Sequence, residues 1–147
     1  MFSSASDMWE TPTYLFNYLN NKYNFTLDVC ATSENAKCEN YYTESDNALN
    51  KEWRGTCWMN PPYGRQIGLW LQKARESAIN NTIVVCLIPA RTDTKYFHEI
   101  CMKADEICFI KGRLKFGTST NSAPFPSAIV IFKEHNKDIP TFSTLEI

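Results

Sequence analysis

The tetrapeptide Asn60-Pro61-Pro62-Tyr63 directly follows a short apolar run, Thr56 to Met59. Two successive prolines lack backbone N–H groups and have a fixed φ, so they end a strand and hold a rigid, extended turn. Such a turn would aim the amide oxygen of Asn60 and the carbonyl oxygen of Pro61 toward one point. Two converging acceptors suit an exocyclic amino group, because they bind both hydrogens and localise the nitrogen lone pair for attack on a methyl donor. Tyr63 would then stack on the base that carries the amino group.

The rest of the chain alternates between helical and strand-like patterns, which indicates an α/β sheet with functional loops at the strand C-termini. Thr11-Pro12 suits a helix start, with Thr as the cap and Pro at the first helical position. The near-continuous apolar run at 82–88 is typical of a central strand that is covered on both faces. The expected helices cover residues 11–22, 65–79 and 93–102, and the expected strands cover 25–31, 56–59, 82–88, 106–110 and 127–132. We expect a three-layer sandwich with a mostly parallel sheet, closed at one edge by an antiparallel hairpin of the last two strands.

Length and composition indicate one globular domain. The chain has 147 residues, of which 44% are hydrophobic and 21% are charged, so we expect residues 1–147 to form a single domain without a separate target-recognition domain. No apolar run reaches the roughly 20 residues that a membrane span needs, and the N-terminus does not resemble a signal peptide. The six cysteines form no C-x-x-C pair. These features indicate a reduced, cytoplasmic protein with no membrane partner and no metal site.

The charge distribution bears on nucleic-acid binding. The net charge is −1, but residues 62–115 carry nine basic and five acidic side chains, whereas residues 1–61 carry four basic and eight acidic ones. A basic middle section would suit contact with phosphates. Ordinary charge variation over a solvated surface explains the same numbers equally well.

Further landmarks accompany the tetrapeptide, which fits the motif Asp/Asn/Ser-Pro-Pro-aromatic of amino-methyltransferases acting on adenine N6 or cytosine N4. In chain order they are Trp9-Glu10-Thr11-Pro12, Leu27-Asp28-Val29-Cys30-Ala31, Asn35-Ala36-Lys37, Asp46-Asn47-Ala48-Leu49, Trp53, Leu87-Ile88-Pro89-Ala90-Arg91-Thr92-Asp93-Thr94, Gly112-Arg113-Leu114-Lys115-Phe116 and Ala123-Pro124-Phe125-Pro126-Ser127. Through these landmarks the chain resembles the compact phage-type Dam family of DNA N-6-adenine methyltransferases. The resemblance covers most of the chain.

This resemblance implies a class I methyltransferase-like, Rossmann-like fold and transfer of a methyl group from S-adenosylmethionine to a flipped-out adenine in double-stranded DNA, without a metal. The catalytic residues that it implies are Asn60, Pro61, Pro62 and Tyr63. The cofactor-binding residues that it implies are Thr11, Pro12, Asp28, Cys30, Ala31 and Asp46.

The implied cofactor contacts differ in kind. Thr11 and Pro12 resemble the segment that contacts the methionine moiety, and Asp46 resembles the acidic residue that bonds the cofactor adenine. The usual glycine-rich loop is missing, since Ala31-Thr32-Ser33 stands in its place. The carboxylate expected on the ribose hydroxyls stays open among Glu34, Glu39 and Glu44.

Five side chains are candidates for DNA contact because they follow a strand or lie in the Gly- and Ser-containing stretch 112–126. They are Arg91, Arg113, Lys115, Phe116 and Phe125. The basic groups would bind the DNA backbone, and the two phenylalanines would stack on the flipped base. Without a separate recognition domain, specificity must come from the loops at 32–50 and 112–126 or from a second subunit, which includes a homodimer.

Two alternatives stay open from the sequence. Methylation of cytosine N4, of RNA or of a protein amide uses the same class of motif, and Asn60 at its head only leans toward adenine. A catalytically silent module would keep the fold and bind DNA or a host protein. We expect a phage or prophage protein in the cytoplasm of a bacterial host. The sequence does not distinguish an orphan enzyme from part of a restriction-modification pair or from a phage defence against host cleavage.

Overall fold

The computed structural model describes residues 8–147. Within this range the α-helices are α1 (Thr13–Tyr23), α2 (Ile67–Ser77) and α3 (Lys95–Glu99). The strands are β1 (Leu27–Asp28), β2 (Thr56–Met59), β3 (Ile83–Pro89), β4 (Glu106–Ile110), β5 (Ser127–Phe132) and β6 (Thr141–Leu145). Short 3-10 helices cover Glu44–Asp46, Ala48–Asn50 and Cys101–Lys103. The α/β class is as predicted.

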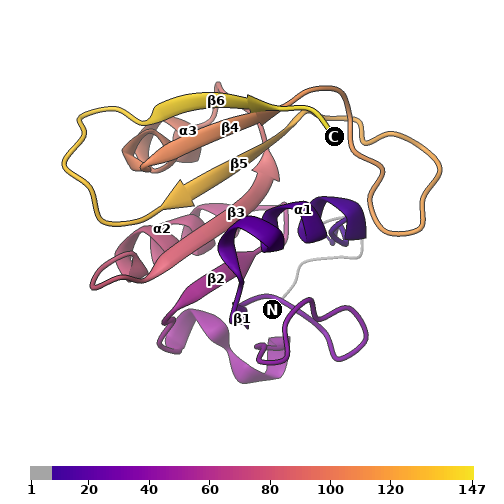
Figure 1. The fold of residues 1–147 in the computed structure, drawn as a ribbon, viewed down its shortest axis with the longest axis horizontal. Coiled ribbons are helices and arrows are strands. Elements are labelled where there is room, and N and C mark those ends of the chain that lie inside the picture. Colours follow the sequence, from indigo (N-terminus) through magenta and orange to yellow (C-terminus); the bar gives the residue numbers. More distant parts are fainter. Residues whose placement is uncertain (1–7) are drawn as a thin grey trace.

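The strands form one mixed sheet in the order β1-β2-β3-β5-β4-β6 (Figure 1). β1, β2 and β3 pair in parallel, and β6 pairs in parallel with β4. β5 runs antiparallel to both of its neighbours, β3 and β4. The expected hairpin strands do pair antiparallel, but they do not close an edge of the sheet. β6, which was not predicted, lies outside β4 and is mostly exposed.

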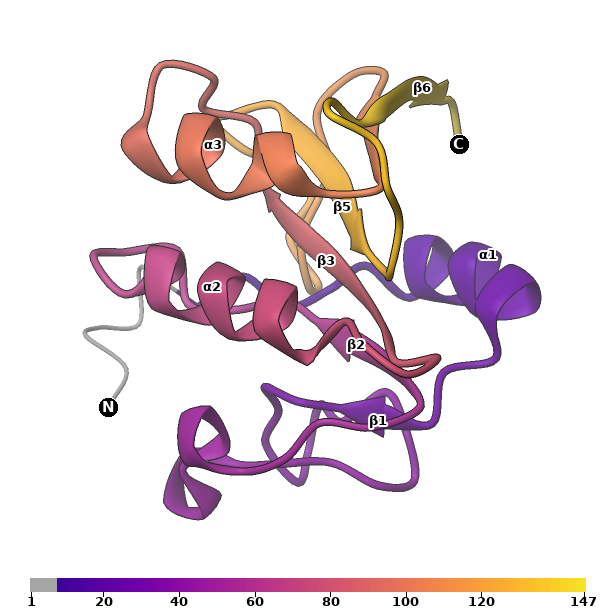
Figure 2. The same cartoon turned by 90° about the vertical axis from the view of Figure 1, so that its left-hand side faces the viewer.

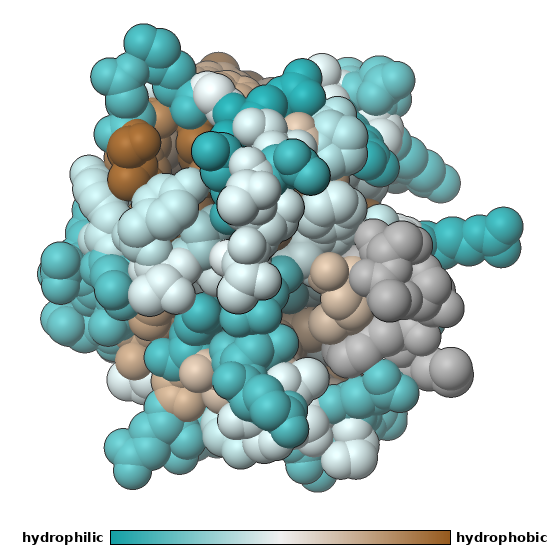
Figure 3. Space-filling view, turned by 90° about the vertical axis from the view of Figure 1, so that its right-hand side faces the viewer, coloured by the Kyte–Doolittle hydropathy of each residue, from teal (hydrophilic) through white to brown (hydrophobic). Residues whose placement is uncertain are grey.

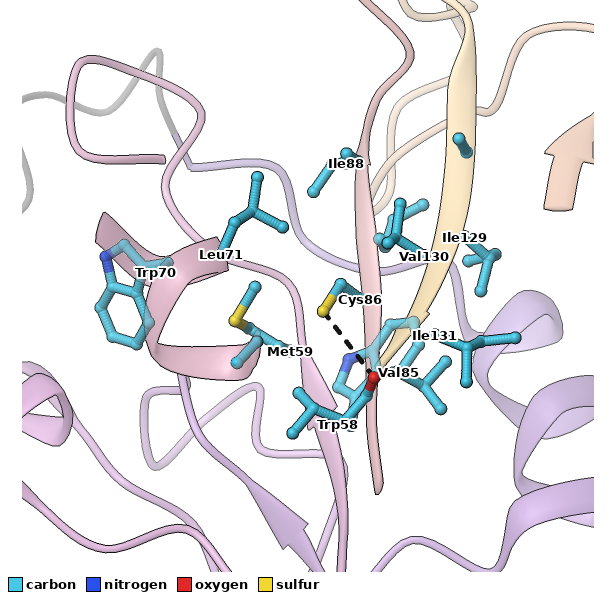
Figure 4. Packing of buried hydrophobic residues seen from close by; sticks show 14 of the residues in the cluster. Trp58, Met59, Trp70, Leu71, Val85, Cys86, Ile88, Ile129, Val130 and Ile131 are labelled. Atoms are coloured by element: carbon cyan, nitrogen blue, oxygen red, sulfur yellow. Dashed lines mark hydrogen bonds between the residues drawn. The ribbon is translucent and has the colours of Figure 1, made fainter. Parts of the chain in front are cut away.

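Helices cover both faces of the sheet. α1 lies on one face, and α2 and α3 lie on the other (Figures 1 and 2). The core is centred on β3 and β5, and every residue from Val84 to Ile88 is 0% exposed, as the apolar run at 82–88 predicts. Figure 4 shows Met59 and Leu71 packed beside β3, with Val130 on the neighbouring β5. The sheet is therefore a rigid platform for the loops at its ends.

The start of α1 differs from the prediction by one residue. Pro12 is the N-cap and makes no side-chain capping bond, and the helix begins at Thr13. The Oγ1 atom of Thr11 is instead an acceptor for Nδ2 of Asn60, at 2.9 Å. A contact between residues 49 positions apart has thus replaced the local cap that the sequence suggests.

Three other elements are shorter than predicted, and one of them is α2, which covers Ile67–Ser77 instead of 65–79. The strand expected over 25–31 is regular only at β1, because the chain turns after Asp28, whose Oδ1 accepts a hydrogen bond from the N–H of Cys30. The helix expected over 93–102 is divided into α3 and a 3-10 helix. The cap of α3 is Thr94, whose Oγ1 accepts from the N–H of Phe97.

All six cysteines are free thiols, and four of them are buried, namely Cys30, Cys57, Cys86 and Cys101. Burial raises the pKa of Cys57 and of Cys101 to about 12. Such thiols stay protonated and unreactive at neutral pH. None of the helices within residues 8–147 combines the length and the apolar composition that crossing a membrane requires.

Candidate active site

The loops that follow the parallel strands meet at one edge of the sheet, namely the edge formed by the carboxyl ends of β1, β2 and β3 and not a lateral edge strand. β1, β2 and β3 pair in parallel, so the residues after Asp28, Met59 and Pro89 lie at the same edge. Pro89 also pairs with Ser127, so the loop 111–126 that leads into β5 returns to this edge. Figure 3 views the side on which this loop lies in Figure 1, and it shows a mostly hydrophilic surface with a few small hydrophobic areas. Functional loops of α/β proteins gather at this end of the strands.

Asn60 leaves β2 at this edge with its side-chain amide bound on one side only. Its Nδ2 donates to the carbonyl oxygen of Trp9 and to Oγ1 of Thr11. A backbone carbonyl can only accept, so the amide nitrogen must face Trp9 and the amide oxygen must point away. The Oδ1 atom of Asn60 is buried and has no hydrogen-bond partner among the described residues. Buried acceptors are normally satisfied, so this atom marks a position for a donor on a bound molecule.

Asn60 lines a cavity of about 190 Å³, whose walls come from the segment before α1, from the turn after β1 and from β2. A second cavity, of about 40 Å³, lies along the segment 43–49 and the start of α2. Cys30 lines both cavities. Two cavities with a shared lining residue, the larger one lined by carboxylate, amide and ammonium side chains, suit an elongated and charged ligand.

Larger hollows lie at the opposite end of the sheet. One, of about 510 Å³, is lined by Gly55 and Thr82, which precede β2 and β3. Another, of about 610 Å³, is lined by Lys133 and His135, which follow β5. Within residues 8–147, every buried side-chain polar atom that lacks a hydrogen-bond partner belongs to a residue outside these two hollows. We therefore place the site in the cavity of about 190 Å³ beside Asn60, where such an atom does occur.

Asp28 holds the turn that forms one wall of the larger cavity. The residue is 3% exposed, and its carboxylate accepts hydrogen bonds from the backbone N–H groups of Cys30, at 3.2 Å, and Lys37, at 3.0 Å. These bonds fix the turn where the sequence lacks a glycine-rich loop. Burial raises the pKa of Asp28 from 3.8 to about 6, although both N–H groups act in the opposite direction.

Tyr63 belongs to a buried aromatic cluster. It is 7% exposed, its hydroxyl donates to the carbonyl of Leu87 at 3.0 Å, and its ring meets the rings of Phe125 and Phe116 edge-on at 5.6 and 6.2 Å. Trp9 packs against the same two phenylalanines at 5.0 and 5.5 Å. Burial raises the pKa of Tyr63 well above 10, so its phenol stays neutral. The predicted stacking roles of Tyr63, Phe116 and Phe125 thus fall on buried side chains.

The three basic candidates for DNA contact are exposed at this edge of the sheet. The guanidinium of Arg91 lies 5.5 Å from the centre of the Phe125 ring, and Nη1 of Arg113 donates to the carbonyl of Ala123 at 3.4 Å. Within residues 8–147, neither arginine nor Lys115 takes part in an ion pair. Their charges are therefore available to phosphates.

The structure brings together only part of the predicted cofactor set. Thr11, Asp28 and Cys30 line the larger cavity. Pro12, Ala31 and Asp46 line neither cavity. The exposed carboxylate of Asp46 instead accepts from the N–H of its neighbour Thr43 at 2.7 Å.

Other residues line the cavities without having been assigned a role from sequence. Trp9, Asn35 and Lys37 line the larger cavity. All three belong to segments whose resemblance to the family is visible in the sequence, and this signal could have identified them. Three carboxylates were left open from sequence as candidates for the ribose hydroxyls. Of these, Glu44 lines the smaller cavity, whereas Glu34 and Glu39 line neither cavity.

Fold and site together define a class of protein. A rigid turn after a parallel strand carries an unpartnered amide oxygen on a residue that lines a polar cavity, and Cys30 in the wall of that cavity also lines a second one. This arrangement is expected of an enzyme that binds an exocyclic amino group next to a second, elongated substrate.

Comparisons with known proteins identify the family. The sequence model of the family described as DNA N-6-adenine-methyltransferase (Dam) matches residues 1–146. The chain is 34% identical over 139 residues to a DNA N-6-adenine-methyltransferase of Haemophilus phage HP1 (strain HP1c1), which covers 88% of this chain and 80% of that protein. It is 35% identical over 114 residues to a DNA N-6-adenine-methyltransferase of Escherichia phage T1. This match covers 76% of this chain and 48% of that protein. The chain belongs to the DNA N-6-adenine-methyltransferase (Dam) family, as its motifs predict.

The buried carboxyl group of Asp28 makes stability depend on pH. Its pKa is about 6 in the folded protein against an ordinary value of 3.8, so the folded state binds the proton more tightly than the unfolded state. We expect the free energy of unfolding, measured relative to Asp28→Asn, to be highest below about pH 4. It should fall by about 3 kcal/mol as the pH rises past 6. Urea unfolding of both proteins between about pH 4 and 7.5 measures this difference, and a difference independent of pH would contradict the assignment.

Proposed function

We propose that this protein methylates the N6 amino group of adenine in DNA and uses S-adenosylmethionine as the methyl donor. The observation that carries the proposal is the buried, unpartnered Oδ1 atom of Asn60 beside the larger cavity. The N6 amino group of adenine supplies the donor that this acceptor lacks. Membership of the family and the printed names of the two phage relatives favour adenine over the N4 of cytosine.

The two cavities suit S-adenosylmethionine in their chemistry. Its charged methionine end would lie in the larger cavity, where Glu10, Asp28 and Lys37 provide both signs of charge. The nucleoside end would pass Cys30 to the smaller cavity, and we assign Glu44 to the ribose hydroxyls because it lines that cavity. A volume of about 40 Å³ means that the smaller cavity must widen to admit an adenine ring. When bound, the cofactor supplies an electrophilic methyl group on a sulfonium sulfur.

The residues of the tetrapeptide would act by binding and orientation. Oδ1 of Asn60 and the carbonyl oxygen of Pro61 accept the two hydrogens of the adenine amino group, which directs the nitrogen lone pair at the methyl carbon. This nitrogen would attack the methyl group that the cofactor supplies, and the pair of electrons of the broken C–S bond would leave with sulfur. The surplus proton on nitrogen then passes to solvent, so no strong general base is required. Most of the rate gain would come from positioning.

The target adenine would have to leave the duplex, because its amino group is otherwise engaged in pairing. We propose that Tyr63 stacks on the flipped base, which contributes about 1–3 kcal/mol for a base on an aromatic ring. Phe116 and Phe125 cover the Tyr63 ring in this structure. Stacking therefore requires the loop 111–126, which carries both phenylalanines, to move when DNA binds.

We propose a compact, single, class I methyltransferase-like domain of three layers, supported by the mixed sheet with helices on both faces. Recognition of the DNA sequence would rest on the segments 32–50 and 111–126, or on a second copy of the chain. The protein would act in the cytoplasm of a bacterial host.

Replacing Asn60 tests the proposed reaction. Asn60→Ala removes the acceptor, and we expect formation of N6-methyladenine from labelled S-adenosylmethionine to fall by about 100-fold or more, the scale reported for one preorganised hydrogen-bonding group. Asn136→Ala is the matched control, because Asn136 is exposed and lines the hollow at the opposite end of the sheet. Digestion of the DNA to nucleosides identifies the product.

The other outcomes of this experiment are equally informative. Label in N4-methylcytosine would overturn the assignment of the base. No transfer to DNA, together with no calorimetric binding of the cofactor, would leave only a catalytically silent binding module.

Two exposed basic residues test the proposed DNA interface. Arg113→Ala and Lys115→Ala should each weaken DNA binding and reduce the slope of log affinity against log salt concentration by about one, because each loses one phosphate contact. Arg75→Ala is the control, since Arg75 is exposed near the C-terminal end of β5, at the other edge of the sheet. Fluorescence anisotropy over a range of salt concentrations measures the slopes. Slopes equal to that of the wild type in both variants would exclude this surface as the interface.

A further inference from the structure

The amide of Asn60 has two possible orientations, and only one of them can bind an amino group. With its oxygen left without a protein partner it can accept a hydrogen, whereas the flipped amide would present two N–H donors to the substrate's own donors. The protein must therefore distinguish amide oxygen from amide nitrogen, which have nearly the same size.

The segment Trp9–Thr11 makes this distinction. Both hydrogens of Nδ2 are used, one by the carbonyl oxygen of Trp9 and the other by Oγ1 of Thr11. Flipping the amide would place Oδ1 against the Trp9 carbonyl, so two acceptors would face each other and both bonds to Nδ2 would be lost. Thr11 is 4% exposed, so water cannot readily replace it as the acceptor.

The segment is itself held in place from the other side. The ring of Trp9 packs edge-on against Phe125 and Phe116, and the carbonyl of Glu10 accepts from the N–H of Gly117 at 2.9 Å. Before DNA binds, these contacts give the Trp9 carbonyl a defined position relative to Asn60. Thr11 is also free to serve Asn60, because the N-cap of α1 is Pro12 and no side chain caps this helix.

We propose that Thr11 is a positioning residue for the reaction and that, together with the Trp9 carbonyl, it holds the Asn60 amide with its oxygen toward the substrate. This role differs from the cofactor contact that the resemblance implies for Thr11. It rests on the proposed function, since it gives the reason why the orientation of Asn60 matters.

A pair of substitutions at Thr11 tests the role in catalysis. Thr11→Val keeps the size of the side chain and removes the acceptor, and we expect kcat to fall about tenfold, the scale of one hydrogen bond. The KM for DNA and the calorimetric Kd for S-adenosylmethionine should stay within about twofold. Thr11→Ser restores the acceptor and should restore kcat, and Thr13→Val, at an exposed position two residues on, should leave kcat unchanged. Weaker cofactor binding by Thr11→Val with unchanged kcat would make Thr11 a cofactor contact and overturn the proposal.

A second measurement does not depend on activity. In ¹⁵N–¹H spectra, the side-chain NH₂ signals of Asn60, assigned by their loss in Asn60→Ala, should be protected from solvent exchange in the wild type. In Thr11→Val the signal of one of the two protons should shift, because that proton loses its hydrogen-bond acceptor. Equal spectra for the two proteins would overturn the positioning role even if methyl transfer is observed. Absence of methyl transfer in the wild type, with the spectral change present, would refute the proposed function and leave the hydrogen bond from Asn60 to Thr11 established.

Discussion

The site depends on one constraint, which is that a buried amide must bind protein on its nitrogen side and leave its oxygen without a protein partner. Asn60 meets it because β2 ends next to β1 and β3, while the segment before α1 crosses the same edge of the sheet. The two prolines prevent the strand from continuing, so the backbone is rigid next to Asn60, whose side chain must be held in one position. Parallel pairing, the Pro-Pro turn and the Trp9–Thr11 segment therefore all fix the position of the same atom, Oδ1 of Asn60.

Asp28 orders the turn at the end of β1, the strand that pairs with β2. A glycine-rich loop would bring backbone N–H groups close to a ligand, but here a buried carboxylate accepts hydrogen bonds from the N–H groups of Cys30 and Lys37. The turn is thereby ordered at the cost of a desolvated charge, which raises the pKa of Asp28 to about 6. Order in the wall of the cavity thus comes from a side chain rather than from glycine geometry.

The sequence predicts the features that depend on local pattern. The continuous apolar run at 82–88 identifies β3, and the tetrapeptide identifies the end of β2. Features that depend on tertiary contacts were not predictable in this way. The exposed, mostly polar β6 is a strand only because β4 offers a free edge, and Thr11 leaves its capping position because Asn60 is nearby. Phe116 and Phe125 lie in a stretch whose Gly and Ser residues suggest an exposed loop, yet both pack on Tyr63.

The most direct test of the role of Asn60 is a crystal structure of the protein with S-adenosylhomocysteine, which is the cofactor after methyl transfer, and an oligonucleotide that contains the target adenine. We expect the N6 amino group to lie within hydrogen-bond distance of Oδ1 of Asn60 and of the carbonyl oxygen of Pro61, while Nδ2 still contacts Trp9 and Thr11. An Asn60 amide turned with its nitrogen toward the base, or an adenine bound away from the cavity beside Asn60, would contradict this role.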